Sequence, residues 1–244
     1  VLSRGENSAT HQIKTEQGLL GGEVLLLPIQ EWFLGSDFPV PNYWNQAFII
    51  KTSGLNISQL KKSMSKLIEH HDAFRLRFRK ERRLEESEGN HTLYAQYYDD
   101  KAPAQELKLL DIRTLTAKEG STEFQTELRG ILTSWQANFD IEAGPIYSLG
   151  YLYGYKDGTA RIYLALHHLI VDTVSWRILT GDLKRLYDGE LLTAKGSSYR
   201  QWSEALKNFA KSHEAEKEYW TNVLSDYKED DGFVNLALNN TPGS

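Results

Sequence analysis

One stretch of the sequence restricts the fold more than any other, because a strand pattern runs directly into a helix pattern at residues 160–187. The short apolar run Ile162–Leu166 is typical of a β-strand. Leucines then recur at helical spacing. Between the two elements lie His167, His168 and Asp172. Loops between rigid elements commonly carry chemistry, and histidine exchanges protons near neutral pH, so we expect a functional site here.

Strand parity distinguishes the two histidines. If the extended backbone continues to residue 168, His168 shares a face with Leu166, whereas His167 points the other way. His168 is therefore the stronger candidate for an acid–base catalyst, and His167 for a supporting residue. The same geometry disfavours a metal site made of His167, His168 and Asp172, because both imidazoles would have to turn toward one ion.

The composition argues against several classes of protein. The chain has 244 residues, enough for one large domain or two small ones. Its 28 basic and 33 acidic residues give a net charge of −5 without a basic block, which argues against binding to nucleic acid or to a membrane surface. The absence of cysteine excludes disulfides and thiolate metal sites and agrees with a cytoplasmic location. The longest apolar run, Val24–Ile29, is too short to span a bilayer.

Strand and helix patterns alternate along the chain, which indicates an α/β (α+β) layered sandwich. Helix starts are predicted at Asn56 and at Ser121 or Thr122, because these side chains are typical N-caps. A hairpin turn is predicted at the Asp-Gly pair of residues 157–158. The strands are expected at residues 44–51, 74–79, 92–98, 106–112, 147–155 and 160–166.

The two ends of the chain differ from its centre. Residues 1–20 are polar and aperiodic, so we expect a linker there. A folded lobe is predicted over residues 21–225. Residues 226–244 are again polar and are predicted to be irregular.

Several bulky side chains are expected to pack inside the lobe. Trp32 is assigned to the core, and Trp202 and Phe209 to the inward face of a late helix. A second histidine pair, His70 and His71, ends the first long helix. A histidine on an apolar helix face is more often a hydrogen-bonded core residue than a catalyst, so we predict a structural role for this pair.

The residues around the first histidine pair carry a resemblance to a known family. They follow the pattern His167-His168-x-x-x-Asp172-x-x-Ser175-Trp176. This pattern resembles the signature of the epimerization domains of nonribosomal peptide synthetases. Condensation domains and chloramphenicol-acetyltransferase-like acyltransferases share His-x-x-x-Asp but have glycine after the aspartate. Here that position is Thr173, which favours the epimerization branch.

Three other segments, residues 28–33, 70–75 and 139–146, resemble further motifs of the family. The resemblance covers residues 22–224 and implies the N-terminal lobe of a chloramphenicol-acetyltransferase-like fold. In that family the active site lies in a tunnel between this lobe and a second one, which contributes an opposing glutamate. The resemblance therefore implies a missing C-terminal lobe, and an excised fragment that is inactive alone.

The resemblance also implies an activity. An epimerization domain converts L to D at the Cα atom of an aminoacyl or peptidyl thioester, and His168 would face its substrate channel. The substrate would arrive on the 4′-phosphopantetheine arm of a peptidyl carrier domain upstream, with residues 1–20 as the linker. No intrinsic cofactor is implied, and a condensation domain downstream is compatible with this arrangement.

The remaining residues of the pattern have two interpretations each. Asp172 either caps the helix that follows it or, by resemblance, forms a structural ion pair with Arg75. Ser175 either donates to a thioester or enolate oxygen or satisfies helix backbone. Trp176 is predicted to serve in packing.

Two other functions stay open. The same histidine could act in amide formation, as in a condensation-type acyltransferase, or the lobe could be a non-catalytic docking module for a carrier protein. Exchange of the Cα proton in heavy water would separate epimerization from both. A serine hydrolase is disfavoured, because the sequence contains no Gly-x-Ser-x-Gly.

Overall fold

The structure is a computed structural model that describes residues 14–36, 38–81, 93–100 and 106–225. Residues 1–13 of the predicted linker and the predicted irregular segment, residues 226–244, lie outside these ranges. The chain divides into two compact units, Val1–Ser203 and Glu204–Ser244.

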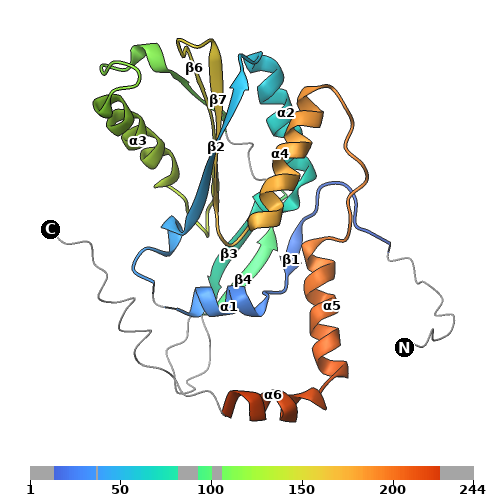
Figure 1. Cartoon of the computed structure of the whole chain (residues 1–244). Helices are drawn as coiled ribbons and strands as arrows, with labels where there is room; N and C mark the ends of the chain where they lie inside the picture. Colours follow the sequence, from blue (N-terminus) through green and yellow to red (C-terminus); the bar gives the residue numbers. More distant parts are fainter. Residues whose placement is uncertain (1–13, 37, 82–92, 101–105, 226–244) are drawn as a thin grey trace, which may run out of the picture. The chain divides into compact units, whose positions relative to one another are not determined.

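Helices and strands are interspersed along the described chain, which ends in three consecutive α-helices (Figure 1). The α-helices are α1 (Pro28–Gly35), α2 (Ile57–His70), α3 (Thr122–Gln136), α4 (Thr173–Tyr187), α5 (Tyr199–Ser212) and α6 (Glu216–Ser225). The strands are β1 (Gly22–Val24), β2 (Asn45–Ser53), β3 (Leu76–Glu81), β4 (Leu93–Tyr98), β5 (Lys108–Asp111), β6 (Tyr147–Tyr153) and β7 (Thr159–His167). Short 3-10 helices lie at η1 (Pro41–Tyr43), η2 (Asp72–Arg75) and η3 (Ile112–Thr114).

The larger sheet has the strand order β2-β7-β6-β5. β7 pairs antiparallel with β2 and with β6, while β5 runs parallel to β6. Helices α2 and α4 cover one face of this sheet and α3 covers the other (Figure 1). The predicted layered α/β arrangement is confirmed.

Both faces of β7 are buried, because alternate side chains enter different cores. Leu164 and Leu166 pack with Leu67 of α2 in the core on one side. Tyr163 packs with Phe124 of α3 in the core on the other side. A strand packed on both faces and paired at both edges is a rigid support, and the first histidine pair stands at its end.

The predicted turns and caps form as expected. In the β6–β7 hairpin, Gly158 has a φ of +70°, which glycine adopts without the steric cost of a Cβ atom. Asn56 Oδ1 accepts a hydrogen bond from the Gln59 N–H at 3.0 Å and begins α2. Ser121 Oγ accepts from the Phe124 N–H at 3.1 Å and begins α3. The predictions for the hairpin and for both helix starts are therefore confirmed.

The smaller sheet has the order β1-β4-β3 and packs against α1. Phe33 of α1 is buried there with Leu76 and Phe78. Trp32 is 60% exposed, so its assignment to the core was wrong. Consecutive helical residues point about 100° apart, and α1 buries only the side that carries Phe33.

Helix α5 exposes the aromatic side chains that the sequence placed inward. Trp202 is 55% exposed and Phe209 is 53% exposed, so both assignments were wrong. Helical spacing reveals an apolar stripe but does not reveal whether another element covers it. None of the described helices has the length and apolar character needed to cross a bilayer.

Candidate active site

His168 stands where β7 ends. The paired register closes with Asn45 opposite His167, and the His168 N–H then donates to the Trp44 carbonyl at 2.7 Å. A turn closed by the Ile170 N–H and the His167 carbonyl, at 3.0 Å, leads toward α4. The pairing with β2 therefore fixes the backbone of both histidines immediately before the chain turns.

The side chain of His167 is sealed inside the protein, with no exposed surface (0%). Its Nε2 lies 2.8 Å from the Pro41 carbonyl, and its Nδ1 accepts from the Leu169 backbone N–H at 3.1 Å. Because an amide N–H can only donate, the ring proton sits on Nε2 and is donated to Pro41. Burial lowers the pKa of His167 to about 4. The ring is therefore neutral near physiological pH and holds the strand end in place.

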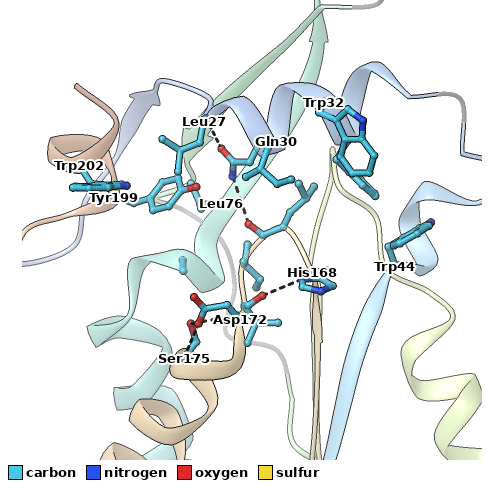
Figure 2. A pocket seen from close by; sticks show the side chains of 16 residues that line it. Leu27, Gln30, Trp32, Trp44, Leu76, His168, Asp172, Ser175, Tyr199 and Trp202 are labelled. Carbon is cyan, nitrogen blue, oxygen red and sulfur yellow. Dashed lines mark hydrogen bonds between the residues drawn. The ribbon is translucent and has the colours of Figure 1, made fainter. Parts of the chain in front are cut away.

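His168 is exposed and lines two hollows in the surface. The larger, of about 630 Å³, lies beneath α1 and beside the start of α4 (Figure 2). The second, of about 420 Å³, is bordered by Val40 and Trp44. A bound molecule in either hollow can therefore reach the His168 imidazole, whereas neither hollow includes His167 among its lining residues.

The larger cavity has mainly apolar walls. Figure 2 shows Trp32 and Trp44 on one side of it and Tyr199 and Trp202 on the other. The exposed indoles of Trp32 and Trp202, which the sequence placed in the core, are thus part of the cavity wall. Gln30 is a polar exception, and its amide donates to Gln96 Oε1 at 2.7 Å. Such a cavity suits a substrate that is largely apolar.

Asp172 begins α4. Its carboxylate accepts hydrogen bonds from the Ser175 N–H at 2.7 Å and the Ser175 hydroxyl at 2.6 Å, while the Asp172 N–H donates to the Ser175 Oγ at 3.3 Å. These reciprocal bonds form a capping box. The Ser175 hydroxyl and N–H hold the pKa of Asp172 below its ordinary value. Both side chains therefore satisfy the helix start, as one of their two interpretations predicted.

The second interpretation of Asp172, an ion pair with Arg75, was wrong. Arg75 is buried, contacts the carboxylate of Asp72, and donates to the Ile68 carbonyl at 2.8 Å. Asp72 is also bound by Lys195 Nζ at 2.8 Å. A carboxylate in the same turn as Arg75 is available without any long-range arrangement, and the Asp172 carboxylate is already occupied by its own helix.

Gln46 of β2, which was not singled out from the sequence, connects His168 with Trp176, near the two ends of the epimerization-like pattern. Its Nε2 lies 3.1 Å from His168 Nε2, and its Oε1 accepts from the Trp176 indole N–H at 2.8 Å. On the other side of the ring, His168 Nδ1 lies 3.2 Å from the Val171 carbonyl. The sequence does not set Gln46 apart, because β2 also carries the polar residues Asn45, Lys51, Thr52 and Ser53.

The second histidine pair fastens α2 to α4. His71 Nε2 lies 2.9 Å from Asp182 Oδ2, and burial lowers the pKa of His71. Potential ligand atoms of His70, His71 and Asp182 lie within 4.8 Å of one another. The direct contact joins two packed helices, in line with the structural role predicted for this pair.

Comparisons with known proteins all relate this chain to one group, the condensation domains and the peptide synthases and synthetases. A family model described as "Condensation domain" matches residues 21–233. N-(5-amino-5-carboxypentanoyl)-L-cysteinyl-D-valine synthase of Amycolatopsis lactamdurans is 44% identical over 211 residues, covering 86% of this chain and 5% of that protein. The synthase of the same name from Penicillium rubens is 38% identical over 223 residues, covering 91% and 6%. A linear gramicidin synthase polypeptide of Brevibacillus parabrevis is 32% identical over 237 residues, covering 93% and 3%. The chain therefore spans only 3 to 6% of these curated relatives.

Solved structures share the fold. The epimerization domain from the third module of tyrocidine synthetase B superposes with a TM-score of 0.73 at 27% identity, covering 88% of this chain and 46% of that one. The starter condensation domain of rhizomide synthetase superposes with a TM-score of 0.64 at 16% identity, covering 85% and 49%. Both likenesses confirm the predicted fold class, and the chain spans about half of each solved protein.

Proposed function

The chain belongs to the condensation-domain family, and from that premise we propose that it supplies the histidine-bearing half of a site that epimerises a thioester at Cα. The substrate is an aminoacyl or peptidyl group held on the 4′-phosphopantetheine arm of a carrier domain. A second lobe completes the site. The match to about half of each solved neighbour supports this division of the site between two lobes.

The observation that carries the proposal is the contrast between two adjacent imidazoles. His168 is exposed and lines both hollows, whereas His167 is buried and hydrogen-bonded through both ring nitrogens. Only the first can meet a substrate without the strand end being dismantled. We therefore assign proton transfer to His168 and a supporting role to His167.

The reaction requires a base on one face of Cα and an acid on the other. The thioester carbonyl acidifies the Cα proton, and His168 accepts that proton through a ring nitrogen. The electrons of the C–H bond then form the enolate, whose charge lies on the thioester oxygen. Protonation from the opposite face gives the D epimer, with no net change in atoms or electrons. We assign that second proton transfer to the other lobe.

Three observations favour epimerization within the family. Thr173 stands where the condensation pattern has glycine, and Ser175 and Trp176 complete the epimerization pattern. The epimerization domain of tyrocidine synthetase B is 27% identical to this chain, against 16% for the rhizomide starter condensation domain. The name shared by the Amycolatopsis and Penicillium synthases includes a D-valine residue. A valyl thioester is therefore the first substrate to test.

Amide formation is the second candidate, because the matching family model is that of the condensation domain. The same imidazole could take a proton from an attacking amine instead of from Cα. The two reactions differ in their products, since amide formation joins two carrier-bound groups and leaves the Cα proton of each in place.

The test uses the synthetase polypeptide that contains this chain, its carrier domain and the second lobe, loaded with an L-aminoacyl phosphopantetheine. We expect D-product and Cα deuterium exchange in heavy water, and His168→Ala should lower both rates about 100-fold or more. His213→Ala, an exposed histidine outside the site, is the matched control and should keep both rates. Undiminished inversion by the His168→Ala enzyme would refute the proposal. Amide product without exchange would favour condensation, and carrier binding without either would favour a docking lobe.

A further inference from the structure

An imidazole acts as a base only through the nitrogen that carries no proton. For His168 that nitrogen is set by the hydrogen bonds around the ring, and three neighbouring groups define it. They are the Val171 carbonyl, the Gln46 amide and, behind the amide, the Trp176 indole.

The indole N–H of Trp176 can only donate a hydrogen bond. The atom of Gln46 that lies 2.8 Å from the indole nitrogen must therefore be the amide oxygen. The amide NH₂ then faces His168 Nε2 at 3.1 Å and donates to it. Nε2 is the acceptor, so the ring proton is on Nδ1, where it is donated to the Val171 carbonyl at 3.2 Å.

We propose that Gln46 is a positioning residue for epimerization, which holds His168 in the tautomer whose basic lone pair is on Nε2. This inference rests on the proposed function. The ring is held from both sides, by Val171 just before α4 and by Gln46 on β2. When a substrate binds, its Cα–H replaces the amide N–H at Nε2, while the Trp176 indole keeps the amide beside the ring.

The neighbouring histidine shows that local partners decide the tautomer in this loop. His167 meets a carbonyl at Nε2 and an N–H at Nδ1, so its proton sits on Nε2. His168 has the reverse arrangement of donors and acceptors and therefore the opposite tautomer. Trp176 thereby has a role beyond packing, because its indole N–H orients the Gln46 amide.

Gln46→Glu is the sharpest test, because it keeps the side-chain shape but replaces the donor with a second acceptor. The carboxylate should draw a proton onto His168 Nε2. Trp176→Phe keeps a ring against Phe48, at a centroid distance of 4.5 Å in the native protein, but removes the indole N–H. The amide is then free to rotate, and we expect a mixture of tautomers. Trp135→Phe, next to Tyr163 on the far side of the sheet, is the control.

The tautomer is read by ¹⁵N NMR of histidine-labelled chain, with the His168→Ala spectrum identifying the signal. We expect the native protein and the Trp135→Phe control to show a protonated Nδ1. The Gln46→Glu protein should show a protonated Nε2, and the Trp176→Phe protein should show both forms.

The same variants are then assayed in the synthetase polypeptide by Cα deuterium exchange. We expect Gln46→Glu to lower kcat for exchange about 10- to 100-fold with little change in KM, since the base rather than substrate binding is altered. A lowered rate with an unchanged tautomer would make Gln46 merely structural, and a changed tautomer with an unchanged rate would remove its positioning role. Absence of exchange in the unmodified polypeptide would instead overturn the proposed function.

Discussion

The buried His167 makes the stability of the protein depend on pH, and the size of the effect follows from its surroundings. Burial lowers the pKa of this imidazole from its ordinary 6.5 to about 4. Protonation would also place an N–H on Nδ1, opposite the Leu169 N–H that this atom accepts at 3.1 Å. Each pKa unit corresponds to about 1.4 kcal/mol, so the difference amounts to about 3 kcal/mol of unfolding free energy.

The sign follows from which state binds the proton first. Below about pH 6.5 the unfolded chain protonates this histidine while the native protein does not, so the stability it contributes is complete above that pH. It is lost progressively as the pH falls toward about 4, and below that value both states are protonated and the loss stops.

The substitution His167→Gln removes the titrating ring but keeps an N–H donor for the Pro41 carbonyl. Urea unfolding followed by tryptophan fluorescence gives the unfolding free energy at a series of pH values and constant ionic strength. Between about pH 7.5 and about pH 4 the native protein should lose about 3 kcal/mol more than the variant. Other titrating groups, such as His71, are common to both proteins and cancel in the difference. A difference in unfolding free energy that stays constant across this range would show that His167 does not titrate between the native and unfolded states as described.

Two further predictions concern stability, and both are checked by thermal and urea unfolding. Asp172→Ala removes the cap of α4 and should cost about 1 kcal/mol, whereas Asp172→Asn, which still accepts a hydrogen bond, should cost less; equal losses would contradict the capping role. Gly150→Ala places a Cβ atom 2.3 Å from the Trp135 ring and should cost about 1–3 kcal/mol. Its control, Gly130→Ala in α3, meets no atom within 4 Å and should gain about 0.5–1 kcal/mol, and a loss there would show that the Gly150 effect is not steric.

The sequence predicted the elements whose signals are local. The alternation of β7, the Asn56 and Ser121 caps, and the Asp157-Gly158 turn each depend on residues close together in the chain, and the structure confirms all of them. Strand parity likewise predicted that His167 and His168 point to opposite sides of the strand. These parts of the site follow from short-range geometry. Strand parity did not predict which of the two histidines is exposed, because both faces of β7 are buried, and the substrate side was assigned to His168 also from the family resemblance.

The wrong predictions concern contacts between residues that lie far apart in the sequence. The pairing of Arg75 with Asp72 rather than Asp172, and the exposure of Trp32 and Trp202 along a cavity, depend on how separate elements come together. Gln46 is 122 residues from His168 in the sequence, so its role emerges only when β2 pairs with β7. A single sequence carries no local signal for such contacts.

The position of β2 has a practical consequence for handling the protein. Within the described part of the chain β2 lies at the edge of its sheet, with β7 as its one partner strand. Phe48 and Ile49 on it are 48% and 50% exposed. A sheet edge with unpaired backbone N–H and C=O groups and adjacent apolar side chains can pair with another extended chain. We therefore expect concentrated solutions of this polypeptide to aggregate through β2, and Ile49→Lys, which leaves the contact between Phe48 and Trp176 in place, should reduce that aggregation.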